Sequence, residues 1–174
     1  LNGKAETPLM GAIVRNHLDV AEYLISVGAN VNIGLTDGHS PLHAACEQGA
    51  WEIAKILIEA GADVNKERND GLTPLIFATW SDNEETVSFL LKNGANPNVS
   101  DEHGFSPLHH AAHHDNTTNI NLLLNSGAEI DARTKENDTP LWVAAWNGNH
   151  KSTDLLIEKG ADVNAIGITG LTIL

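Results

Sequence analysis

Five histidines gather between residues 100 and 132, together with five acidic residues and no lysine or arginine. The pairs His109/His113 and His110/His114 have the i,i+4 spacing that places two imidazoles on one helix face. Such a pair can chelate a transition metal, but the sequence indicates no third ligand. We therefore predict no metal site, with His110 and His114 kept as the less favoured metal pair, and we favour a surface that titrates near neutral pH.

Signatures of catalysis are missing from the sequence. It contains no glycine-rich phosphate loop, no HExxH, no CxxC and no GxSxG motif. The adjacent acids Glu84 and Glu85 fall at an expected helix start, where the helix dipole favours negative charge. We predict a protein that is not an enzyme and needs no cofactor.

The bulk composition narrows the class of partner. A net charge of −13 disfavours nucleic acids and anionic membranes, which attract basic surfaces. No apolar run approaches the length of about 18 residues that membrane insertion needs. The single cysteine, Cys46, cannot form an internal disulfide and fits a reducing compartment. We therefore expect an intracellular protein of the cytoplasm or nucleus.

Two motifs recur at one fixed interval along the whole chain. A Thr-Pro-Leu or Ser-Pro-Leu triplet starts at positions 7, 40, 73, 106 and 139, and a Gly-Ala pair at 28, 61, 94, 127 and 160. Both motifs therefore repeat every 33 residues. A constant period of 33 residues indicates a stacked array in which each repeat buries its apolar face against its neighbours. The sequence predicts one domain, 1–174, divided into repeats 1–33, 34–66, 67–99, 100–132, 133–165 and a partial repeat 166–174.

The ends of the chain fall inside repeats, so we expect a fragment of a longer array. An apolar tail with no polar cap supports further repeats or a capping helix, because terminal repeats need polar outer faces. The tail residues are Ile166, Ile168, Leu171, Ile173 and Leu174.

Within one repeat the residues predict a turn and two helices. Ser40 can cap a helix whose first residue is Pro41, and Gly49 ends that short helix. A second helix with an apolar stripe then runs to the stop signal at Gly61. One leucine per repeat should be buried at equivalent positions: Leu24, Leu57, Leu90, Leu123 and Leu156.

These motifs resemble those of the ankyrin repeat family over essentially the whole chain. Residues 40–46 and 106–112 are similar to its T-P-L-H-x-A-A stretch, and residues 61–65 and 160–164 to its G-A-D-V-N stretch. The resemblance implies an all-α solenoid of helix pairs joined by protruding β-hairpin turns. It also implies a protein-binding scaffold, and a turn-bonding role for His109.

Some repeats depart from the family pattern. The turn glycine is replaced by Ala5 and Asn137, of which only asparagine tolerates positive φ. We therefore expect an irregular first hairpin. Thr86, Asn119 and Ser152 replace the valine and isoleucine that earlier repeats carry on the second helix. We expect the later repeats to be less well packed on that face and less stable locally.

The resemblance implies a concave groove lined by hairpin tips and by the exposed face of each first helix. Trp80, Phe105 and Trp146 are expected to form a ridge there, because large apolar groups at solvent-facing positions are typical of interfaces. The alternative, that the tryptophans fill gaps against the next helix, remains open. The predicted partner-binding residues are Asp37, His39, Asp70, Leu72, Trp80, His103, Phe105, His113, His114, Asp138 and Trp146.

The predicted function is a non-catalytic scaffold that binds another protein with an apolar centre and a basic rim, since acids surround the ridge. One alternative is the recognition arm of a larger enzyme, channel or pathogen effector. Another is a selected or designed binder. Between about pH 7 and 5 the histidine-rich fourth repeat should gain positive charge and bind a basic partner less tightly.

Overall fold

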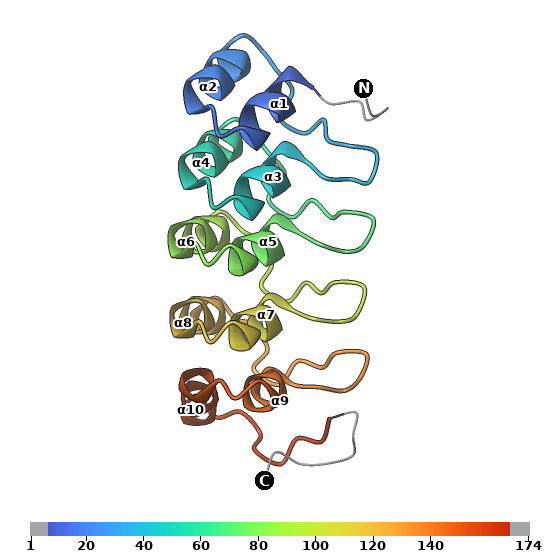
Figure 1. Cartoon of the computed structure of the whole chain (residues 1–174), viewed down its shortest axis with the longest axis vertical. Helices are drawn as coiled ribbons and strands as arrows, with labels where there is room; N and C mark the ends of the chain where they lie inside the picture. Colours follow the sequence, from blue (N-terminus) through green and yellow to red (C-terminus); the bar gives the residue numbers. More distant parts are fainter. Residues whose placement is uncertain (1–6, 168–174) are drawn as a thin grey trace. The chain divides into compact units, whose positions relative to one another are not determined.

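The computed structural model describes residues 7–167, which form five helix pairs and contain no strand (Figure 1). The expected all-α fold is confirmed. Within this part of the chain no helix is long and apolar enough to cross a membrane. The helices are α1 (Pro8–Val14), α2 (Leu18–Ser26), α3 (Pro41–Glu47), α4 (Trp51–Glu59), α5 (Pro74–Trp80), α6 (Glu84–Lys92), α7 (Pro107–His113), α8 (Thr117–Asn125), α9 (Pro140–Trp146) and α10 (His150–Glu158).

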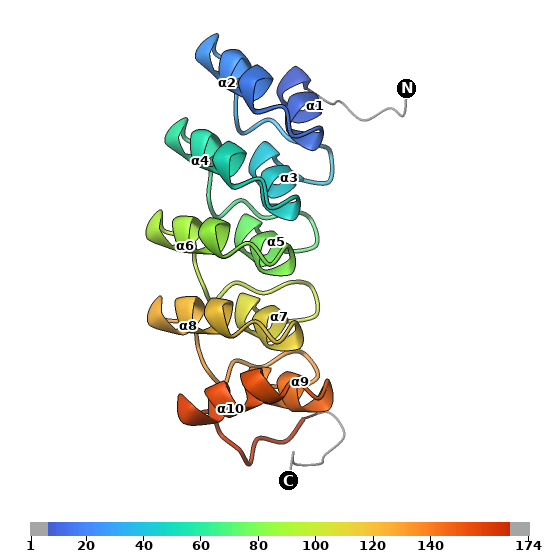
Figure 2. The same ribbon diagram turned by 60° about the vertical axis from the view of Figure 1, so that its left-hand side comes forward.

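The helix pairs belong to two compact units, residues 1–95 and 96–174. In the N-terminal unit the first helices α1, α3 and α5 pack in one layer and α2, α4 and α6 in a second (Figures 1 and 2). In the C-terminal unit α7 packs on α9, and α8 packs on α10. The expectation that residues 1–174 form a single domain stays a prediction.

The first helix of each pair is short and starts in the same way. A threonine or serine in extended backbone precedes a proline at the first helical position, where the missing N–H is not needed. The hydroxyl of Ser40 accepts a hydrogen bond from the backbone of α3, as predicted, and Ser106 does the same for α7. Thr73 makes no such bond, and its buried hydroxyl has no partner among the described residues.

The second helices of four of the five described pairs each supply one buried leucine. Leu57, Leu90, Leu123 and Leu156 are all fully buried, which confirms the prediction for these positions. Leu24 is only half-buried and corrects it. The reason is that α2 is the first second-layer helix among residues 7–167, and within that part of the chain α4 packs on it with no preceding second-layer helix on its other side (Figure 1).

The polar residues that depart from the family pattern are buried at one equivalent position. Thr86 is satisfied because its hydroxyl donates to Asn83 Oδ1 at 2.8 Å. The side-chain amide of Asn119 and the hydroxyl of Ser152 have no hydrogen-bond partner within residues 7–167. An unpaired buried polar group destabilises a fold by about 1–3 kcal/mol. The predicted lower local stability of the later repeats therefore keeps a physical basis, although it stays a prediction.

Each helix pair is linked to the next through a tight turn. In the first complete turn, Leu35 N donates to His39 O at 2.9 Å and Gly38 N donates to Leu35 O at 3.0 Å. The same two bonds recur in the three following turns. In the last of them Asn137 takes the glycine position with a φ of 68°, as its tolerance of positive φ allows.

Neighbouring turns are also joined backbone to backbone within each unit. Asn69 N donates to Asp37 O, and Lys135 N donates to His103 O, both at 3.0 Å. The turns approach so closely that a Cβ on Gly104 would lie 2.8 Å from Lys135 N. These bonds fix the turn tips, which carry many of the predicted binding residues. Three predictions that concern the chain ends fall on residues outside the described part: the irregular hairpin at Ala5, the partial repeat 166–174 beyond residue 167, and the tail residues Ile168, Leu171, Ile173 and Leu174.

Candidate protein-binding surfaces

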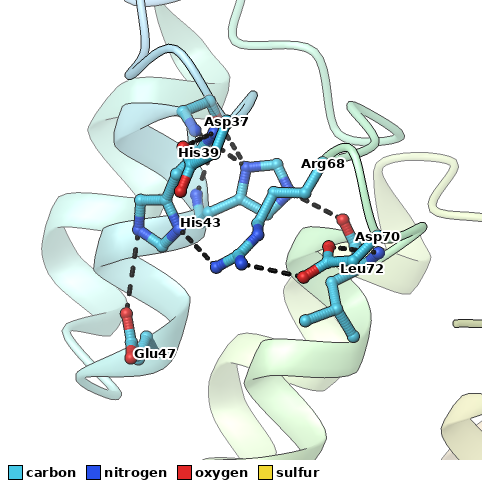
Figure 3. A network of polar contacts seen from close by, with 8 residues as sticks. Asp37, His39, His43, Glu47, Arg68, Asp70 and Leu72 are labelled. Atoms are coloured by element: carbon cyan, nitrogen blue, oxygen red, sulfur yellow. Dashed lines mark hydrogen bonds and ion pairs between the residues drawn. The ribbon is translucent and has the colours of Figure 1, made fainter. Parts of the chain in front are cut away.

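A polar network joins two adjacent turns of the N-terminal unit (Figure 3). Arg68 Nη1 donates to His39 Nδ1 at 3.3 Å, and Arg68 Nη2 donates to Asp70 Oδ2 at 2.8 Å. His39 N–H donates to Asp37 Oδ1, and this bond lowers the pKa of Asp37. Because arginine only donates, His39 Nδ1 must accept, which leaves the ring proton on Nε2. That nitrogen lies 3.7 Å from a carboxylate oxygen of the exposed Glu47.

The ring of Phe77 packs against this network. The Phe77 side chain is 2% exposed and belongs to the core. The guanidinium of Arg68 lies over its ring, 5.6 Å from the centroid, in a cation–π contact. His39 and Trp80 both meet the ring edge to face, with centroids 5.6 and 5.0 Å away. Trp80 is thereby held in place while 38% of its surface remains exposed.

His43 connects a helix cap to the next turn. Its Nδ1 accepts from the backbone N–H of Ser40 at 3.0 Å, and its Nε2 lies 3.1 Å from the carbonyl oxygen of Leu72. A backbone N–H can only donate, so Nδ1 carries no proton and Nε2–H donates to Leu72. Burial lowers the pKa of His43 to about 4. The neutral ring is thus a fixed structural link between α3 and the half-buried tip residue Leu72.

His109 has the same role in the C-terminal unit. Its Nδ1 accepts from Ser106 N at 3.1 Å, and its Nε2–H donates to Asp138 O at 3.0 Å. The turn-bonding role that the resemblance implied for His109 is therefore confirmed. Burial lowers its pKa. Burial also lowers the pKa of the neighbouring His110 to about 4, although Asp101 lies 3.4 Å from its Nε2 and favours the charged form.

Desolvation corrects the expected pH response of two of these histidines. It lowers the pKa of the buried His109. It lowers the pKa of the mostly buried His110 to about 4, so His110 stays neutral between pH 7 and 5. The three histidines of the same repeat that remain exposed are His103, His113 and His114. Within residues 7–167 no group of three or more His, Cys, Asp or Glu side chains is arranged to hold a metal ion.

The C-terminal unit carries the more exposed of the two tryptophans among the predicted binding residues. Trp146 is 69% exposed and stacks on Trp142 of the same helix, with centroids 5.0 Å apart and ring planes at 11°. Phe105 is half-buried, and its ring lies 5.5 Å from that of His109. Exposed His103 lies 3.8 Å from a carboxylate oxygen of Glu102.

The structure places the other predicted residues unevenly. His39 is 8% exposed and Asp138 is 4% exposed, so these two are buried parts of their turns rather than open tips. Asp37, Asp70 and Leu72 are half-buried around the Arg68 network, and His113 and His114 are exposed with rings 5.1 Å apart. The ridge expected to connect Trp80, Phe105 and Trp146 involves residues of both units and stays a prediction.

Sequence reasoning missed Arg68, which binds residues of two turns. Its signal was present, because a basic residue two positions before Asp70 at a turn can form a local ion pair. The stacking of Trp142 under Trp146 was also missed, although their i,i+4 spacing on one helix predicts contact.

The geometry agrees with comparisons to known proteins. A family model described as ankyrin repeats in three copies matches residues 9–101 and again residues 95–166. A search of curated proteins found no match. Repeats of this family are generally modules for protein–protein interaction and are typically non-catalytic. With helix pairs, caps and turns that recur at a constant interval across both matches, the chain belongs to the ankyrin repeat family.

Proposed function

We propose that this chain is a non-catalytic scaffold that binds another protein through its turn tips and first helices. The observation that carries the proposal is Trp146, which is 69% exposed although it is large and apolar. Such a side chain at a solvent-facing helix position is typical of an interface anchor. Its stacking on Trp142 holds the ring in one orientation before a partner arrives, which lowers the entropic cost of binding.

The proposal involves one surface in each unit. The N-terminal surface comprises Asp37, Asp70, Leu72 and Trp80, and the buried His39 belongs to the turn beneath it. The C-terminal surface comprises His103, Phe105, His113, His114 and Trp146, and the buried Asp138 belongs to the turn beneath it. Acids exceed bases thirteen to six in residues 1–95 and ten to four in residues 96–174. A partner with an apolar centre and a basic rim complements this combination of aromatic groups and negative charge.

The same surfaces would serve equally as the recognition arm of a larger enzyme, channel or pathogen effector. A selected or designed binder is a weaker alternative, because the unpaired buried polar groups of Asn119 and Ser152 are unlike an idealised repeat. The buried thiol of Cys46, whose pKa burial raises, suits the intracellular location that we propose.

Selection from a displayed peptide library provides the test. Peptides that bind the wild-type chain are isolated, and their affinities for Trp146→Ala, Trp80→Ala and Trp51→Ala are measured. Trp51 is a matched control, because it lies on the second-layer helix α4 and not on either proposed surface. We expect Trp146→Ala to weaken binding at least about tenfold without lowering the melting temperature.

Trp51→Ala should leave the affinity unchanged. Selected peptides that bind Trp146→Ala and Trp80→Ala as tightly as wild type would contradict the proposed surfaces.

A further inference from the structure

The N-terminal unit already holds one arginine side chain between an aromatic ring and a carboxylate. The guanidinium of Arg68 lies over the ring of Phe77, 5.6 Å from its centroid, and Nη2 donates to Asp70 Oδ2 at 2.8 Å (Figure 3). A guanidinium suits such a site because it is planar, weakly hydrated and able to stack on a ring while it donates to a carboxylate. This internal site shows which groups bind a guanidinium here.

The same two kinds of group are exposed at the ends of two neighbouring helices. Glu47 is the last residue of α3, and Trp80 is the last residue of α5, at the same position one repeat later. The helices α3 and α5 pack side by side in the first layer (Figure 1). The side chain of Glu47 is 58% exposed, and Trp80 is 38% exposed. A carboxylate and an indole ring therefore face solvent on adjacent helices.

The spacing of packed helices suits a guanidinium that contacts both groups. The axes of packed helices lie about 8–10 Å apart. A charged N–H donates to a carboxylate at about 2.8 Å, and a cation is attracted to an indole within about 6 Å of the ring centroid. These two contacts together span about 9 Å, so that one guanidinium can reach both Glu47 and Trp80.

The charges around these two side chains favour a cation. Asp37, Glu47 and Asp70 supply three carboxylates against the one guanidinium of Arg68, which is already bound to Asp70. The imidazole Nε2 of His39 lies 3.7 Å from Glu47 Oε2, which is longer than a hydrogen bond. The carboxylate of Glu47 can therefore still accept from a donor that a partner supplies.

From these groups we propose that the N-terminal surface binds one arginine side chain of the partner protein between Glu47 and Trp80. The partner's guanidinium donates to the carboxylate of Glu47 and lies against the indole of Trp80, in the way that the internal arginine is bound. This inference rests on the proposed function, because the arginine belongs to a bound polypeptide. It adds Glu47 to the N-terminal surface and fixes the place of one basic group of the partner.

The C-terminal unit differs at the same two positions. His113 is the last residue of α7, and Trp146 is the last residue of α9. An imidazole replaces the carboxylate there, so this pair lacks the negative charge that selects a guanidinium. Peptides that bind through Trp146 should therefore not need Glu47, and they provide an internal control.

The peptides selected from the displayed library test the proposal. Those that Trp80→Ala weakens at least about tenfold should share one arginine beside an apolar residue. Alanine in place of that arginine, or Glu47→Gln in the chain, should each weaken binding about three- to tenfold. The two changes together should weaken it little more than either alone, because both remove the same contact.

Glu52→Gln is the matched control, since it removes an equal charge on the second-layer helix α4. It should change the affinity less than about twofold, because exposed charges at a distance are screened. Thermal unfolding of Glu47→Gln controls for folding.

Three results would overturn the arginine site: Trp80-dependent peptides without a shared arginine, fully additive effects of the two changes, or a selection without any Trp80-dependent peptide. Peptides that depend on Trp146 would then still support the proposed function. Only peptides that are indifferent to both tryptophans contradict that function itself.

Discussion

The two units differ most clearly at one pair of positions that recurs in successive repeats. In the N-terminal unit, Arg68 lies over the ring of Phe77. In the C-terminal unit, the corresponding residues are Asp101 and His110, an acid and an imidazole 3.4 Å apart. The same backbone framework therefore holds a cation on an aromatic ring in one unit and a titratable pair in the other. The repeat determines where the side chains lie, and the individual residues determine how each unit responds to its environment.

The exposed tryptophans follow the same division. Trp80 packs edge to face against the buried Phe77 ring and is 38% exposed, whereas Trp146 stacks on the half-buried Trp142 and is 69% exposed. Trp80 thus contributes both to the core and to a surface, while Trp146 is free to act mainly at the surface. The sequence alone treats the two as equivalent, because they occupy the same repeat position.

Removing the aromatic ring of Phe77 should have the largest effect on the free energy of unfolding. Phe77→Ala deletes a 2% exposed ring that contacts Arg68, His39 and Trp80, so we expect a loss of about 3–5 kcal/mol in the free energy of unfolding. His110→Ala should cost less, because His110 is smaller and more exposed. Urea denaturation of both variants measures the difference. Equal losses would remove the distinction between the two units.

Acid should destabilise the C-terminal unit through His110. Its pKa is about 4 in the folded chain against 6.5 ordinarily, so the unfolded state binds more protons as pH falls. The contribution of neutral His110 to the free energy of unfolding is therefore fully present above about pH 6.5. It is lost as the pH falls towards 4, and the loss is about 3 kcal/mol at most for this group.

His110→Phe, which mimics Phe77, should reduce this pH dependence without abolishing it, as followed by urea denaturation between pH 7.5 and 4.5. His43, with a pKa of about 4, should contribute a similar acid loss that His110→Phe leaves in place. An unchanged pH dependence in His110→Phe would mean that the Asp101–His110 pair does not titrate with folding.

Replacing the buried polar side chain of Asn119 with an apolar one should have the smallest effect on stability. Asn119→Val removes an amide that has no described partner, and we expect a gain of about 1–2 kcal/mol in stability. Thr86→Val is the control in the N-terminal unit, because its hydroxyl is already bonded to Asn83 and little should be gained. Thermal unfolding compares the two. A destabilised Asn119→Val would show that the amide is satisfied in solution.

The predictable part of the structure is the part specified by neighbours in sequence. Ser40 and Pro41 define a helix start, and Gly61 a helix end, whatever surrounds them. Burial of His110 and of Asp138 could not be predicted, since it depends on neighbouring helices and turns. The low pKa of His110 follows from that burial and was missed for the same reason. Leu24 is half-buried because it belongs to the first described helix pair. The periodicity of the sequence predicts equivalent positions but not this difference in their exposure.

The central claim is that Trp146 anchors a partner protein. The four tryptophans of the chain can be labelled with 5-fluorotryptophan and their ¹⁹F NMR signals assigned by single substitution. Access of a soluble paramagnetic agent to each ring is then measured with and without a selected ligand. We predict strong access to Trp146 in the free chain and its loss in the complex, with the Trp51 signal unaffected. A Trp146 signal that remains accessible in the saturated complex would contradict the account.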